Sequence, residues 1–315
     1  MKPNHRYAIV VVFAFLVVAS TAVWGQPSSP QRVEISFAGR LEGKPFACGA
    51  QYEGVGTKKS TVTPQDLRFF VSEVELVDAN GKGVPVALDQ DGIWQYKSVA
   101  LIDLEDGTGA CRNGNAATHA AVTGSVPDGH YTGLRFTVGV PFELNHGDTL
   151  SAPSPLNMTA MFWSWQGGYK FIRAEVALVT NVAEAAKRSP RSAVQKAGVH
   201  TDAPADPTRS SGFPVHLGST GCASAAPSAA PPTECKHPNR VVVTLPEFDP
   251  AKEIVIFDLG KLLADSDVST NAPNTAPGCM SAENDPDCVP IMRALGLPLR
   301  GSPAGTQEVF YREAK

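Results

Sequence analysis

Two tryptophans one residue apart, Trp163 and Trp165, are the densest chemical feature of this sequence. In a β-strand, side chains two positions apart point to the same face, so the pair predicts one aromatic ledge. On spacing alone such a ledge indicates a core strand, because aromatic side chains favour strands and bury large areas. Together with Tyr169, the same ledge could instead stack on sugar rings.

Imidazole groups are the second feature. His146 follows an alternating segment at residues 131–140, and His216 comes shortly before Cys222. One histidine among apolar residues and turn formers is more often structural than a ligand. Two such histidines in an exported chain suggest metal binding through imidazole. A third donor is then required, because two ligands leave most metals under-coordinated.

The N-terminus predicts export. A basic start, an apolar run at residues 7–18 and small residues up to Gly25 predict a signal peptide over residues 1–25, cleaved after Gly25 or, as a second choice, after Ala22. An uncleaved anchor is the alternative, because residues 7–23 approach spanning length. We favour the signal peptide, since no basic cluster follows the run. No later segment predicts a membrane span, so we expect a periplasmic or cell-surface protein.

An even number of cysteines follows the signal sequence, and in an exported chain this indicates disulfides. The six are Cys48, Cys111, Cys222, Cys235, Cys279 and Cys288. Closeness along the chain favours Cys222 with Cys235 and Cys279 with Cys288, which leaves Cys48 for Cys111. Proximity alone does not fix this pairing. A thiolate metal site is less favoured, because no CxxC spacing occurs.

Composition points to a β protein. Charged residues make up 18% of the chain, whereas it has 28 glycines and 26 prolines, which favours a loop-rich β fold. The net charge of −4 does not indicate a nucleic-acid-binding protein. No motif of a serine hydrolase, a zinc protease, a P-loop protein or a c-type cytochrome occurs, so we do not expect an enzyme.

The pattern of apolar residues predicts an all-β fold, an antiparallel β-sandwich with long loops. Residues 26–315 are expected to form one domain, with a loop insertion at residues 181–212. The C-terminal part is expected to be an appendage stapled by cysteines, with a short helix at 289–295. Strands are predicted at residues 33–37, 67–77, 84–88, 98–104, 131–140, 159–165, 169–179, 240–245 and 253–259, with a hairpin at Gly167 and Gly168.

A set of motifs in a fixed order resembles the MbnP family of exported copper-binding proteins, which are related to methanobactin-type copper operons. The resemblance covers nearly all of the mature chain, apart from the insertion at 181–212. The motifs are KPFACG (44–49), DLRFFVS (66–72), WQ (94–95), ALIDLEDGTG (100–109), Cys111, GVPF (139–142) with NH (145–146), FWSWQ (162–166), GYKF (168–171), HLGSTGC (216–222) and PGCM (277–280).

The resemblance implies how copper would be bound. In the family, the first tryptophan of the WxW motif is oxidised to kynurenine by a dihaem cytochrome c peroxidase of the MauG type, and copper binding depends on that change. The matching residue is Trp163. From their places in family-like motifs, His146 and His216 are inferred to be further ligands of one copper, as Cu(I). Trp165 is expected to pack beside the site or to relay oxidising equivalents. The implied role is copper homeostasis.

Two other hypotheses belong to different classes. One is a carbohydrate-binding β-sandwich module that uses Trp163, Trp165 and Tyr169 as a stacking platform. The other is a purely structural, disulfide-stapled surface protein with the WxW strand in its core. Dependence of copper binding on Trp163 would distinguish the copper hypothesis from both.

Overall fold

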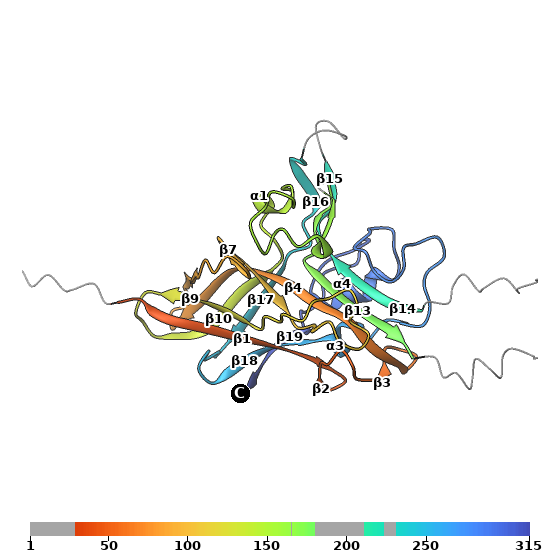
Figure 1. The fold of residues 1–315 in the computed structure, drawn as a ribbon, viewed down its shortest axis with the longest axis horizontal. Coiled ribbons are helices and arrows are strands. Elements are labelled where there is room, and N and C mark those ends of the chain that lie inside the picture. The colour runs from red at the N-terminus through yellow and green to blue at the C-terminus, as the bar shows by residue number, and fades with distance from the viewer. Residues whose placement is uncertain (1–28, 165, 180–210, 224–230) are drawn as a thin grey trace, which may run out of the picture.

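Two large β-sheets form the body of the molecule in a computed structural model, which describes residues 29–164, 166–179, 211–223 and 231–315 (Figure 1). One sheet has six strands in the order β19–β18–β1–β9–β6, with β2 paired to β1. The other has nine strands and runs β14–β13–β4–β10–β17, with β3, β5, β7 and β8 added alongside. The predicted β-sandwich is confirmed.

The strands of the six-stranded sheet are β1 (Gln31–Leu41), β2 (Lys44–Pro45), β6 (Ala87–Leu88), β9 (Ala121–Val126), β18 (Glu253–Asp258) and β19 (Phe310–Ala314). Those of the nine-stranded sheet are β3 (Tyr52–Val55), β4 (Ser60–Asp78), β5 (Gly83–Pro85), β7 (Gln95–Tyr96), β8 (Val99–Asp103), β10 (Tyr131–Val138), β13 (Ile172–Leu178), β14 (Gly212–Leu217) and β17 (Val241–Pro246).

Strand pairing is antiparallel with one exception among the described strands. β1 and β18 run parallel, with Phe37 opposite Val255 and Arg40 opposite Asp258. Parallel neighbours need a long crossover connection, and more than half of the chain separates these two strands. An alternating pattern of residues within one strand does not report the direction of its neighbour. The parallel pairing of β1 with β18 could therefore not be predicted from the sequence.

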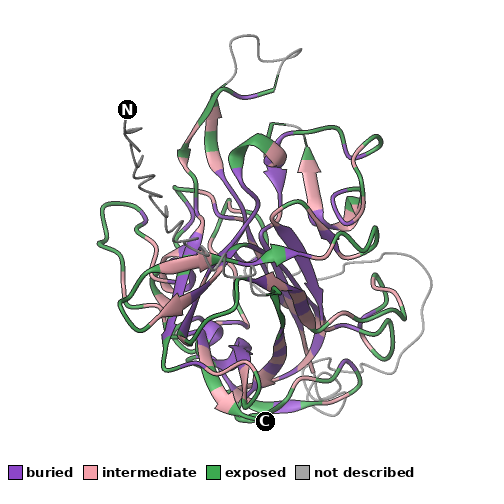
Figure 2. Cartoon of the chain, turned by 90° about the vertical axis from the view of Figure 1, so that its left-hand side faces the viewer, coloured by how far each residue is buried: buried purple, intermediate pink, exposed green. Residues whose placement is uncertain are grey.

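Five phenylalanines, drawn from both sheets, form the centre of the core. Phe69 of β4 stacks on Phe257 of β18 with ring centroids 5.2 Å apart. Phe37 of β1 meets Phe69 and Phe136 edge to face at 5.8 and 5.7 Å. Phe310 of β19 packs on Phe257 at 4.9 Å. All five rings are at most 3% exposed, so this cluster joins the sheets. Figure 2 shows that buried residues lie mainly along the strands of the sandwich.

Two smaller sheets lie outside the sandwich. β11 (Phe162–Ser164) pairs with β12 (Gly168–Tyr169), and β15 (Thr220–Ala223) pairs with β16 (Glu234–His237). The predicted hairpin at Gly167 and Gly168 is therefore present, but the predicted strand at 159–165 is wrong at its start. A 3₁₀ helix, η1 (Thr159–Met161), precedes β11 and turns the chain over β13.

Helices are short: α1 (Phe142–Asn145), α3 (Leu259–Leu263) and α4 (Cys288–Ala294), the last confirming the predicted C-terminal helix. Among the described residues, no helix is long and apolar enough to cross a bilayer. The C-terminal segment is stapled by Cys279–Cys288, as expected. It contributes more than an appendage would, because its last strand, β19, pairs with β18 and supplies Phe310 to the core.

Three disulfides join the pairs that proximity favoured: Cys48–Cys111, Cys222–Cys235 and Cys279–Cys288. Three other sequence predictions lie outside the described residues: the signal peptide at 1–25, the core of the insertion at 181–212, and the position of Trp165.

Candidate metal centre

Trp163 lies half-buried on β11, and its ring rests on two glycines. A Cβ atom on Gly218 would lie 2.4 Å from Cζ3 of Trp163 and 2.8 Å from the carbonyl oxygen of Tyr169. A Cβ atom on Gly167 would lie 3.3 Å from Cβ of Trp163. Position 218 therefore lacks a side chain because the benzene edge of the indole occupies that space.

Asn145, at the end of α1, connects three segments of the site. Its Oδ1 accepts a hydrogen bond from the backbone N–H of Tyr169 at 2.8 Å, and its Nδ2 donates to Oγ of Ser219 at 3.4 Å. The residue is 1% exposed. Gly168 has a φ of +72°, and a Cβ there would lie within 2.6 Å of the Asn145 amide. Asn145 thus ties α1 to the β11–β12 hairpin and to the segment after β14.

His146 follows Asn145 and is 6% exposed. Its Nε2 lies 3.2 Å from Nδ2 of Asn145 and 3.4 Å from Sγ of Cys235. Its ring is tilted against Phe142, with centroids 5.1 Å apart. The imidazole is therefore held beside the Cys222–Cys235 disulfide, which joins β15 to β16.

His216 lies on β14, on the face opposite the core residues Val215 and Leu217. Its Nε2 is 2.6 Å from Oε1 of Glu175 on the neighbouring β13. Burial lowers the pKa of His216 below its ordinary value, although the hydrogen bond to Glu175 acts in the opposite direction. A neutral ring that donates Nε2–H to this carboxylate keeps its lone pair on Nδ1, the arrangement often found in histidines that bind metals.

Charged groups continue from Glu175 across the same face of the sheet. Burial opposes ionisation of Glu175, but hydrogen bonds from His216 and Arg173 outweigh it and hold the pKa of Glu175 at about 2. Arg173 also lies 3.1 Å from Oδ2 of the buried Asp66. The Ala160 carbonyl accepts hydrogen bonds from Arg173 and from Nζ of Lys170. These bonds hold η1, which leads into Trp163, over the charged face.

One segment, residues 216–222, links the surroundings of Trp163, His146 and His216. His216 begins it, Gly218 lies under the Trp163 ring, and Ser219 contacts Asn145. Cys222 ends it, bonded to the cysteine beside His146. The His216 side chain lies on the Glu175 side of β14, two positions before Gly218 in the chain. Figure 1 shows α1, β15 and β16 gathered at the same end of the molecule.

The structure argues against the sugar-binding platform. Tyr169 is fully buried, and its hydroxyl donates a hydrogen bond to the Leu156 carbonyl. Its ring packs edge to face on Phe70 at 5.5 Å and on Phe162 at 4.9 Å. A ring enclosed in this way has no face to offer a sugar. Trp165, the third member of that platform, lies outside the described residues.

A hollow of about 530 Å³ opens beside the indole. It is lined by Trp163, Ser164, Gln166, Gly167, Ser219, Thr220, Gly221, Cys222 and Met280. The half-buried Met280 was not singled out by sequence, although it directly follows Cys279 in the PGCM motif. Its thioether is a soft donor of the kind that suits Cu(I).

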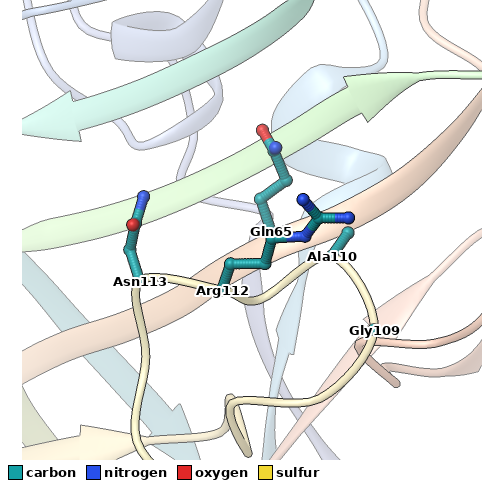
Figure 3. Close-up of a pocket in the computed structure, with 5 residues that line it drawn as sticks. All are labelled: Gln65, Gly109, Ala110, Arg112 and Asn113. Atoms are coloured by element: carbon teal, nitrogen blue, oxygen red, sulfur yellow. The ribbon is translucent and has the colours of Figure 1, made fainter.

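A second hollow, of about 460 Å³, shares no lining residue with the first (Figure 3). It is lined by Gln65, Gly109, Ala110, Arg112 and Asn113. None of these side chains is an imidazole, a thiolate, a thioether or a carboxylate, so this hollow does not fit a metal ion. The hollow beside Trp163, in contrast, is lined by the Met280 thioether.

Comparison with known proteins identifies the family of this chain. The profile of the MbnP family matches residues 30–281. The fold is similar to the solved structure of MbnP from Methylosinus trichosporium, with a TM-score of 0.73 and 34% sequence identity over 91% of this chain and 99% of that one. No curated protein sequence matches the chain. The match over most of the chain, and over nearly the whole of a solved member, shows that this protein belongs to the MbnP family.

Proposed function

We propose that this protein is an exported copper-binding protein that matures when Trp163 is oxidised to kynurenine, and that it acts in copper homeostasis rather than as an enzyme. The observation that carries the proposal is the placement of Trp163 on Gly218, within the segment that runs from His216 to the disulfide beside His146. Three disulfides support export, because such bonds persist in oxidising compartments.

The donor set explains why oxidation is required. The indole N–H is only a hydrogen-bond donor and has no lone pair for a metal. Removal of four electrons from the indole by an oxidising partner, with two oxygen atoms taken from water, would break the C2–C3 bond of the five-membered ring and leave a ketone at C3. Hydrolysis would then release C2 as formate and free the aryl amine, so the side chain would gain two groups with lone pairs. Trp163 would then add a third donor to the imidazoles of His146 and His216, and the copper would serve as the bound cargo or cofactor. Nitrogen donors in low number, with the Met280 thioether nearby, suit Cu(I).

The site also offers access to an oxidising partner. Trp163 is only half-buried and borders an open hollow, whereas Tyr169 behind it is enclosed. We infer that the partner is a MauG-like dihaem cytochrome c peroxidase, which would withdraw electrons from the indole. Trp165 would relay those electrons or pack beside the site. A Trp165→Phe protein that is still fully modified at Trp163 would exclude the relay.

The test is co-expression with and without the peroxidase, followed by intact mass and copper content. We expect the mass gain of kynurenine and one bound copper per chain only with the partner. The tryptic peptide that ends at Lys170 contains both Trp163 and Trp165, so fragment spectra must locate the change.

Trp163→Phe should abolish both the modification and the copper. The matched control is Trp94→Phe, because Trp94 stacks on His119 away from this site and its loss should leave copper content unchanged. Unmodified protein that binds copper as tightly as the oxidised form would contradict the proposal.

A further inference from the structure

The Cys222–Cys235 disulfide differs from the other two in its accessibility. Cys48, Cys111, Cys279 and Cys288 are 0–2% exposed, whereas Cys222 and Cys235 are only partly buried. The pair lies directly across β15 and β16, with Cα atoms 3.8 Å apart. Because thiol–disulfide exchange requires in-line access to a sulfur atom, a small dithiol is expected to reduce this bond before the two enclosed ones.

An imidazole already lies against this disulfide. Nε2 of His146 is 3.4 Å from Sγ of Cys235, and the ligand atoms of His146, Cys222 and Cys235 all lie within 4.8 Å of one another. Ligands bonded to one ion at about 2.0–2.3 Å are separated by roughly 3.5–4 Å. The nitrogen and one sulfur are therefore close to this spacing. Only the two sulfur atoms, which are bonded to each other in the disulfide, would have to separate.

We propose that reduction of the Cys222–Cys235 disulfide creates a second metal site, in which His146 and the two thiolates bind Cu(I). A dithiol gives two electrons and two protons to the sulfur pair, the S–S bond breaks, and the dithiol becomes a disulfide. Cu(I) then replaces the two thiol protons. Two thiolates are soft donors that suit Cu(I), and imidazole also binds copper. The site does not require oxidation of Trp163, although it shares His146 with the copper site proposed above.

The arrangement gives the two sites a defined relation. While the disulfide is intact, its sulfur atoms are not thiolate ligands, and His146 would serve the kynurenine site. After reduction, the same imidazole has two stronger soft donors beside it. The two sites should therefore compete for one histidine, and the redox state of the hairpin should decide which of them holds copper.

The experiment uses the Trp163→Phe protein, which cannot form kynurenine. One sample is left oxidised, and another is treated with dithiothreitol, freed of the reductant without oxygen, and labelled with iodoacetamide in an aliquot. Labelling should occur at Cys222 and Cys235 and not at the four enclosed cysteines. Cu(I) is then titrated against a chromophoric chelator. We expect the reduced sample to bind one more copper per chain than the oxidised sample, with sulfur neighbours in its X-ray absorption spectrum.

Two further variants test whether the folded protein places His146 and both thiolates on the same copper ion. In the Trp163→Phe background, replacing Cys222 and Cys235 by serine should abolish the extra copper, and His146→Asn should weaken it at least about tenfold. His130→Asn is the matched control, because His130 is exposed and should leave affinity unchanged. Dependence on His146 separates a folded site from two loose thiols, which would bind Cu(I) without the imidazole.

The proposal is overturned if the verified reduced protein binds no extra copper, or if the extra copper persists in the serine pair or at full affinity in His146→Asn. These outcomes are independent of the kynurenine hypothesis. That hypothesis is tested by the mass and copper content of wild-type protein co-expressed with the peroxidase, with its disulfides intact. Either site can fail while the other stands.

Discussion

The interior of the sandwich and the region around Trp163 are built in opposite ways. The interior consists of long strands whose aromatic side chains interlock from two sheets, as at Phe69, which is fully enclosed by Phe37, Phe257 and Phe310. The Trp163 region, comprising α1, β11, β12, β15 and β16, has strands of two to four residues. Its side chains are held by single hydrogen bonds, close glycine contacts and one accessible disulfide.

The difference indicates how the two regions divide their roles. Large apolar burial stabilises the interior, and no single polar contact is needed there. In the Trp163 region, apart from the enclosed Tyr169, individual contacts such as that of Gly218 with the indole decide where the side chains lie. Substitutions in the interior should therefore change stability without changing copper binding, whereas substitutions in the Trp163 region should change copper binding and have a smaller effect on stability.

The largest expected effect on stability comes from the interior. Phe69→Ala removes a ring that is fully buried and contacts three other phenylalanines. We expect the free energy of unfolding to fall by about 3–5 kcal/mol, measured by urea denaturation. Copper per folded chain should stay the same. Val242→Ala on the exposed side of β17 is the control and should change stability by less than about 0.5 kcal/mol, because Val242 is 61% exposed. Loss of copper from folded Phe69→Ala protein would show that the two regions are coupled.

A smaller effect on stability, with a large effect on copper, is expected at Gly218. Gly218→Ala places a methyl group 2.4 Å from the indole and 2.8 Å from a backbone oxygen, so the ring must move. We expect a loss of about 1–3 kcal/mol in the free energy of unfolding, as for other overpacked sites, together with reduced formation of kynurenine and reduced copper content.

The matched control for Gly218 is Gly49→Ala. A Cβ atom at Gly49 would meet nothing within 4 Å, so stability and copper should both stay unchanged. Full modification and full copper content in Gly218→Ala would mean that the position of the indole is not critical.

The same contrast explains what could be predicted from sequence. Alternation along β4 and β10 and the cysteine spacing identified the sandwich and its disulfides, because these depend on patterns within short segments. The parallel pairing of β1 with β18 and the contact of His146 with Cys235 join positions far apart in the chain, so no local pattern reports them. The family motifs identified Trp163, but not the glycine that accommodates it or the nearby Met280.

The smallest expected effect is a pH dependence that belongs to the polar face of the sheet and not to the interior. Burial lowers the folded-state pKa of His216, despite Glu175, while Lys170 and Arg173 act in the same direction as burial. The unfolded chain therefore binds the proton more readily. Above about pH 6.5, His216 is neutral in both states and does not lower the free energy of unfolding. As the pH falls below that value, proton uptake by the unfolded chain lowers the free energy of unfolding.

The test is urea denaturation of copper-free protein between about pH 8 and about pH 5, a range that includes the ordinary pKa of histidine. In His216→Gln, the fall in stability below about pH 6.5 should be smaller than in the wild type, because the titrating group is gone. His130→Gln, at an exposed position, should follow the wild-type curve. Glu175, whose pKa is about 2, should contribute only at lower pH, where its stabilising charge is lost from about pH 4.5 downward. Parallel curves for His216→Gln and the wild type would mean that this imidazole is not held neutral by burial, and the ligand role that depends on its neutral form would lose its support.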